Sequence, residues 1–219
     1  MKKLLILAVL LAAPAMYAAA EQYACCNYEE KSLYGLNTNT TRVEFFGGVA
    51  IPQGYWDESG QRLEVGDLGF SGGIAFVRNV LPVLSLGLDA NFSAFSKGDD
   101  VLYQGQNVNY RSGVGTALVT GRFYLFPKSM TRLYATGGIG AGYMYAREKN
   151  VNTKDTKIYD SVDFAWMLGA GLEFDIDETV IFGVEGRYNW TALRSEMKDR
   201  FGHDDFDYWT VLLKLGVKF

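Results

Sequence analysis

From residue 41 onward, apolar and polar positions of the sequence alternate in eight successive runs. In the first run, Val43, Phe45 and Val49 occupy odd positions, and Arg42 and Glu44 occupy even ones. Successive side chains of a β-strand point to opposite faces, so this alternation predicts strands that each have one apolar face. The predicted strands span residues 42–51, 68–76, 84–93, 116–125, 133–145, 162–174, 180–190 and 208–219.

The connections between these runs alternate in length. Short connections are expected at 78–82, 127–131 and 175–179, and long polar ones at 52–67, 96–109, 147–160 and 191–207. Short turns at one end and long loops at the other are typical of outer-membrane barrels. We therefore expect an all-β fold in residues 41–219: a transmembrane, up-and-down antiparallel β-barrel of about eight strands.

The two faces of the predicted strands differ in charge. One face of all eight runs contains no Asp, Glu, Lys or Arg. The other face contains ten charged residues: Arg42, Glu44, Asp89, Arg122, Asp163, Glu173, Glu185, Arg187, Lys214 and Lys218. A soluble carrier barrel has an apolar interior, but the bulky apolar residues of this chain would overfill a narrow lumen. We therefore expect the uncharged face to contact lipid and the charged face to line the lumen.

Charges inside a narrow lumen need partners, because an unpaired buried charge costs several kcal/mol. The ten residues comprise five acids and five bases. All of them except Arg42 and Lys218 are candidates for ion pairs that plug the lumen or gate a narrow pore.

Aromatic residues recur at the ends of the predicted strands. Tyr143, Tyr145, Tyr188, Trp190 and Trp209 lie next to the long loops. Phe76, Phe123, Phe174 and Phe182 lie near the short turns. Aromatic side chains gather at both interfaces of a membrane, so these positions predict two aromatic girdles.

The N-terminal segment resembles a secretory signal peptide that is cleaved after residue 20. Lys2 and Lys3 precede an apolar run at 4–13, and small residues precede Glu21. This run is about half of the ~20 residues that a membrane-spanning helix needs. Residues 1–20 are therefore expected to be removed, and residues 21–40 to form a periplasmic leader.

The cysteine content argues against a disulfide framework. Cys25 and Cys26 are the only cysteines and are adjacent in the leader. Lipid attachment at Cys25 is disfavoured because Gln22 and Tyr23 precede it, where the lipidation pattern has an apolar and a small residue. A pair of free thiols is the remaining interpretation.

The overall charge makes a nucleic-acid partner implausible. The chain has 25 acidic and 21 basic residues, and two of the bases lie in the signal peptide. The aromatic content of 15%, with 25 Gly and only 4 Pro, favours strands over disorder.

Few residues suggest a chemical site, and we assign no catalytic residue, cofactor or metal. His203 is the only histidine and has no downstream serine. The pairs Asp99–Asp100 and Asp204–Asp205 lack the ligand spacing of a calcium loop. The glycine-rich stretch 137–142 lies within a predicted strand, where close packing in a narrow barrel explains it better than phosphate binding.

Several segments resemble the small outer-membrane barrels typified by the N-terminal domain of outer membrane protein A. They are LYATGGIGAGYMY at 133–145, MLGAGLEF at 167–174, FGVEGRY at 182–188 and the terminal LLKLGVKF. The final Phe219 resembles the signal that such proteins present to the barrel-assembly machinery. The resemblance covers the mature chain and implies a fold rather than an activity.

Three functions are compatible with this sequence. The first is a structural or surface-interaction role in the outer membrane, with a lumen that ion pairs plug. In this role the long loops, one of which carries Tyr55 and Trp56, contact an extracellular ligand. The second is a small porin-like channel, and the third is a lipid A modifying enzyme. The expected partners are outer-membrane lipid and lipopolysaccharide.

Overall fold

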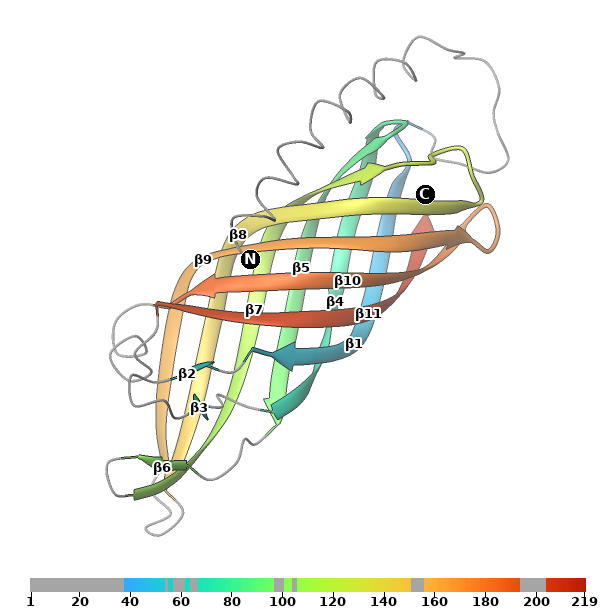
Figure 1. The fold of residues 1–219 in the computed structure, drawn as a ribbon. Coiled ribbons are helices and arrows are strands. Elements are labelled where there is room, and N and C mark those ends of the chain that lie inside the picture. The colour runs from blue at the N-terminus through green and yellow to red at the C-terminus, as the bar shows by residue number, and fades with distance from the viewer. Residues whose placement is uncertain are drawn as a thin grey trace.

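Eight long antiparallel strands form a closed barrel in the computed structural model (Figure 1). The structure describes residues 38–53, 55–56, 62–63, 67–96, 101–103, 106–150, 156–193 and 204–219. The long strands are β1 (Thr41–Pro52), β4 (Asp67–Leu81), β5 (Leu84–Ser96), β7 (Gln106–Tyr124), β8 (Thr131–Asn150), β9 (Thr156–Asp175), β10 (Val180–Ala192) and β11 (Asp205–Lys218). Three short strands, β2 (Tyr55–Trp56), β3 (Arg62–Leu63) and β6 (Val101–Tyr103), lie between them. None of the described segments is a helix long and apolar enough to cross a membrane.

Each long strand is hydrogen-bonded to two neighbours. β1 pairs with β4 on one side and with the last strand, β11, on the other. The pairing of β5 with β7 completes the circle. A closed barrel leaves no strand edge unpaired, which is the condition for strands to cross a lipid bilayer. The predicted eight-stranded antiparallel barrel is confirmed.

Several strands extend further than the alternation predicts. β8 and β9 pair as far as Lys149 and Thr156, so most of the expected loop 147–160 is strand. β7 begins at Gln106, inside the expected loop 96–109, and β11 begins at Asp205, inside the expected loop 191–207. Alternation reveals a strand only where one face is apolar, whereas pairing needs only backbone hydrogen bonds. The predicted boundaries at this end of the barrel were therefore wrong.

The two ends of the barrel differ as the sequence suggests. The short turns and the C-terminus lie at one end, and β2, β3 and β6 lie at the other (Figure 1). At the short-turn end, β4 continues to Leu81, so the turn is shorter than the expected 78–82. In the turn after β9, the backbone N–H groups of Thr179 and Val180 donate to Asp177 at 2.6 Å and lower the pKa of its carboxyl group.

The two faces of each strand have opposite environments. Outward-facing apolar side chains are largely exposed, for example Val119 at 59% and Ile139 at 61%. Inward-facing charged side chains are buried, for example Arg122 at 2% and Glu185 at 0%. The outside of the barrel is therefore apolar and its lumen is charged.

Glycines allow the strands of this narrow barrel to approach closely. At Gly140, a Cβ atom would lie 2.1 Å from the backbone oxygen of Ala117 on the neighbouring strand. At the outward-facing Gly186, a Cβ atom would meet nothing within 4 Å. A methyl group therefore requires a shift of the backbone at the first position and none at the second.

We expect Gly140→Ala to lower the free energy of unfolding by about 1–3 kcal/mol, the usual cost of overpacking. Gly186→Ala is the matched control and should change it by less than about 0.5 kcal/mol. Urea unfolding from lipid vesicles, followed by tryptophan fluorescence, measures both values. Equal stability of the two variants would contradict the close approach of β7 and β8.

Candidate functional site

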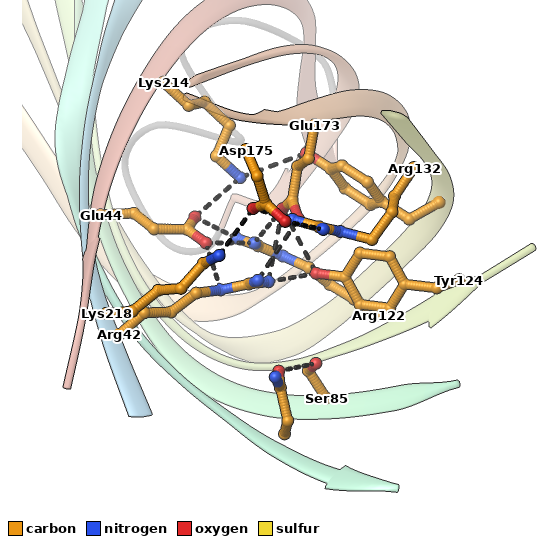
Figure 2. A network of polar contacts seen from close by, with 12 residues as sticks. Arg42, Glu44, Ser85, Arg122, Tyr124, Arg132, Glu173, Asp175, Lys214 and Lys218 are labelled. Carbon is orange, nitrogen blue, oxygen red and sulfur yellow. Dashed lines mark hydrogen bonds and ion pairs between the residues drawn. The ribbon is translucent and has the colours of Figure 1, made fainter. Parts of the chain in front are cut away.

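The lumen holds buried charged side chains from opposite sides of the barrel (Figure 2). Arg122 of β7 donates to both carboxylate oxygens of Glu44 on β1, at 2.6 and 2.7 Å, and to Glu173 of β9 at 3.1 Å. Arg42 contacts the same two acids: its Nε lies 2.8 Å from Glu44, and its terminal nitrogens donate to Glu173 at 3.3 Å. Two arginines and two glutamates therefore connect three strands across the lumen.

This cluster continues toward the short turns. Arg132 of β8 donates to both oxygens of Asp175 on β9, at 2.5 and 2.7 Å. Lys218 of β11 donates to the same carboxylate at 2.7 Å. A distance of 3.9 Å between Arg132 and Glu173 links this group to the central cluster. Arg132 and Asp175 were not predicted from the sequence, although each lies one residue beyond a predicted strand and has the parity of the lumenal face.

The cluster also continues toward the long loops. Lys214 of β11 lies 3.0 Å from Glu44 and donates to Glu185 of β10 at 2.6 Å. Arg187 donates to Glu185 and, at 2.9 Å, to Asp89 of β5. Together these side chains form the lumenal ion network: Arg42, Glu44, Asp89, Arg122, Arg132, Glu173, Asp175, Glu185, Arg187, Lys214 and Lys218.

Two buried tyrosines tie into the network. Tyr124 accepts a hydrogen bond from Arg42 and donates to Glu173 at 3.2 Å. Tyr134 donates to Glu185, and the Arg122 guanidinium lies 5.3 Å from the centre of its ring. Hydrogen bonds and cation–π contacts thus pair the two rings with the buried charges of the lumen.

The structure brings together seven of the eight residues singled out from the sequence for lumenal ion pairs. The eighth, Asp163, lies farther along β9 opposite Gly142, and its Oδ1 accepts the backbone N–H of Phe164 at 2.8 Å. Arg42 and Lys218, which were not among the eight, belong to the network.

Small polar side chains follow the ion network toward the long-loop end, and on β5 Asn91 and Ser93 come directly after Asp89 on the lumenal face. Ser71 donates to Asn91 at 2.9 Å and accepts from Ser93 at 2.9 Å. Asn189 of β10 donates to Thr210 at 3.3 Å. These hydrogen bonds satisfy polar groups that the lumen buries.

The long-loop end of the lumen is filled by apolar side chains. Phe95 of β5 packs edge-on against Phe206 and Tyr208 of β11, with ring centres 5.4 and 5.3 Å apart. The apolar cluster comprises Ala50, Phe95, Val114, Met144, Ala146, Leu193, Phe206 and Tyr208, and all of them are buried. This cluster was not predicted from the sequence because most of its residues, including Phe95, Val114 and Phe206, lie outside the predicted strands.

Aromatic side chains form a belt around part of the outer wall. Trp166 lies 5.6 Å from Tyr188 and 6.1 Å from Trp190, and Tyr188 lies 5.1 Å from Trp209, measured between ring centres. The side chain of Trp190 donates to Asp205 at 2.6 Å, and Tyr188 donates to Asp207. These rings, with Tyr143 and Tyr145 6.4 Å apart, make up the aromatic belt. That the belt marks a membrane interface stays a prediction.

The remaining residues singled out from the sequence lie outside the lumenal ion network and the aromatic belt, or outside the described residues. Phe219 is exposed, and its backbone N–H donates to Thr41 at 2.8 Å. The stretch 137–142 lies inside β8, as expected. His203, Asp99–Asp100, Cys25, Cys26 and the whole segment 1–37 lie outside the described residues. Within the described ranges, no three His, Cys, Asp or Glu side chains come together as a metal site would require.

Comparison with known families gives a match over nearly the whole chain. A family model described as "Outer membrane protein beta-barrel domain" matches residues 5–219. The chain belongs to this family. Its members are outer-membrane proteins, so the protein is located in the outer membrane of a Gram-negative bacterium.

Solved structures of other outer-membrane barrels share the fold. Neisserial surface protein A (NspA) is 13% identical with a TM-score of 0.50, and the match covers 82% of this chain and 97% of that one. Ail of Yersinia pestis is 14% identical with a TM-score of 0.51, covering 84% and 100%. OprG of Pseudomonas aeruginosa is 15% identical with a TM-score of 0.51, covering 84% and 98%. A search among curated proteins finds no match. At these identities the likeness concerns the fold alone.

Membership of this family explains the inverted polarity of the molecule. The outward apolar side chains of this outer-membrane barrel meet lipid, and the family's bilayer is one that contains lipopolysaccharide. The charged lumen, enclosed by the strands, then replaces the apolar core of a soluble protein.

Proposed function

We propose that this outer-membrane barrel has a closed lumen and acts through its outer surface and loops, as a structural or surface-interaction protein. The observation that carries the proposal is that side chains fill the lumen at two levels. The lumenal ion network occupies the short-turn half, and the apolar cluster occupies the long-loop half. A solute that crossed the barrel would have to displace both.

The ion network is suited to closing the lumen because its members are almost fully buried. Arg122 and Glu44 are 2% and 3% exposed and share two hydrogen bonds. Separating such a pair in a narrow lumen leaves uncompensated charges, at a cost of about 3–5 kcal/mol. The pairs therefore oppose spontaneous opening.

The test is the single-channel conductance of the refolded mature chain in a planar bilayer. Only protein whose gel mobility shifts on heating is used, because this shift identifies a folded barrel. We expect a folded barrel that gives no discrete current steps. Discrete steps whose amplitude changes in Glu185→Ala or Arg187→Ala, and not in the exposed control Arg78→Ala, would contradict a closed lumen.

A small ion channel is the second candidate, and one observation favours it. Five of the six bases in the lumenal ion network each contact two acids. For example, Arg122 contacts Glu44 and Glu173, and Lys214 contacts Glu44 and Glu185. Such side chains can exchange partners without being left unpaired, which would lower the cost of a gating movement. The conductance measurement separates this candidate from the first.

We propose no catalytic function. A lipid-modifying reaction at the rim needs a nucleophile and a general base, and the sequence has a single histidine, His203, with no serine after it. No modification of labelled lipid A by the refolded chain would agree with this view, whereas modification that is lost in His203→Ala would contradict it.

A further inference from the structure

Three basic side chains are exposed together on the outer wall of β7 and β8. Arg111 of β7 lies directly opposite Arg147 of β8, and Lys149 is the next outward-facing residue of β8. Directly opposed side chains have Cβ atoms about 4.5–5.5 Å apart, and alternate residues of one strand lie about 7 Å apart. These three residues form the outer basic patch.

The two directly opposed arginines favour the binding of an anion that would compensate their charges. Like charges directly opposite on neighbouring strands destabilise the pairing. Within the part of the chain that the structure describes, neither Arg111 nor Arg147 forms an ion pair with an acid. The acidic group nearest in register on this outward face is Asp160 of β9, which lies opposite Tyr145 rather than opposite Arg147. The patch therefore keeps an excess of positive charge.

The patch lies immediately beyond the aromatic belt. Tyr145 is the outward-facing residue before Arg147, and its ring lies over Gly113 of β7 and stacks on Phe92 at 6.5 Å. On β9, Val162 lies opposite Tyr143 and is 69% exposed. Apolar wall, aromatic belt and positive charge thus follow one another along the barrel, in the order of an acyl chain, an interface and an anionic headgroup.

We propose that Arg111, Arg147 and Lys149 bind the phosphate groups of an anionic glycolipid in the outer leaflet. The guanidinium groups suit this role because they form paired hydrogen bonds with phosphate oxygens. The adjoining apolar wall supplies the surface for the acyl chains, which a free phosphate ion would not use. The proposal rests on the long-loop end of the barrel facing the outside of the cell, as in the proposed function. It does not depend on whether the lumen conducts ions.

The experiment measures binding of bisphosphorylated lipid A to the refolded mature chain by native mass spectrometry. The test variant is Arg111→Gln/Arg147→Gln. The control is Arg78→Gln/Lys128→Gln, which removes two exposed bases at the short-turn end. Each variant must show the heat-dependent gel shift of a folded barrel. Dephosphorylated lipid A and inorganic phosphate serve as probes that lack either the phosphates or the acyl chains.

We expect the test variant to bind lipid A about 30-fold more weakly, which corresponds to the loss of two surface charges near an anionic lipid. The control should stay within about twofold of the unmodified chain, and dephosphorylated lipid A should not distinguish the variants. Equal binding by the test variant and the unmodified chain would overturn the proposal. Displacement of lipid A by inorganic phosphate at equal concentration would overturn it as well, because the patch would then be a general anion site.

Discussion

Replacing Arg122 by Met should lower the free energy of unfolding of the barrel by about 3–5 kcal/mol, the usual cost of removing one partner from a buried ion pair. Methionine keeps most of the volume of the side chain but none of its hydrogen bonds. Glu44 would lose its two short hydrogen bonds, and Glu173 would lose one. The measurement is urea unfolding from phosphatidylcholine vesicles.

A double-mutant cycle separates the ion pair from other effects of the substitution. Glu44→Gln should also destabilise the barrel, because it weakens the contacts of Glu44 with Arg122, Arg42 and Lys214. The double variant should lose less stability than the sum of the single variants, since the second substitution removes a group that the first left unpaired. Additive losses would mean that Arg122 and Glu44 do not stabilise each other.

An exposed arginine provides the matched control for this prediction. Arg78 lies on the outer wall of β4, where its side chain donates to Asn39 at 3.4 Å in a solvent-exposed contact. Arg78→Met should change the free energy of unfolding by less than about 0.5 kcal/mol. A large loss in this variant would show that arginine removal acts through a mechanism other than burial.

The fold could be predicted from the sequence because one physical condition acts on every strand. Lipid on one side and a narrow lumen on the other force side chains to alternate, and Arg122 beside Phe123 or Glu185 beside Val184 shows this directly. On β8 this alternation ends beyond the aromatic belt, where the outward-facing Arg147 and Lys149 are charged and exposed. The ends of β8 and β9 near Asn150 and Thr156 were therefore missed, since both of their faces lie beyond the belt.

The lumen was predicted less completely than the fold. Charge on one face identified residues such as Glu44 and Lys214, but the alternation does not show which charges meet across the barrel. The apolar cluster was missed because Phe95 and Phe206 lie beyond the ends of the predicted strands 84–93 and 208–219. Such residues pack against each other only when the barrel closes and brings β5 and β11 into one lumen.

Replacing Ile139 by Arg should destabilise the barrel by about 2–4 kcal/mol, the cost of a charged side chain on the lipid face near the middle of a bilayer. Ile139 faces outward midway along β8, between Leu133 near the short turn and Tyr145 in the aromatic belt. It lines a shallow apolar groove on the outer wall with Val119 and Trp166. Because the groove is open, the longer side chain fits without a clash, and the cost arises from charge in hydrocarbon.

The control for this prediction places the same charge at the edge of the membrane. Met130 is 52% exposed in the short turn before β8, and Met130→Arg should cost about 0–1 kcal/mol, as at an interface. Folding into phosphatidylcholine vesicles of defined thickness measures both variants. Equal stability of Ile139→Arg and Met130→Arg would mean that the uncharged face does not contact hydrocarbon. A loss confined to Ile139→Arg would show that the apolar wall contacts the hydrocarbon core of the bilayer.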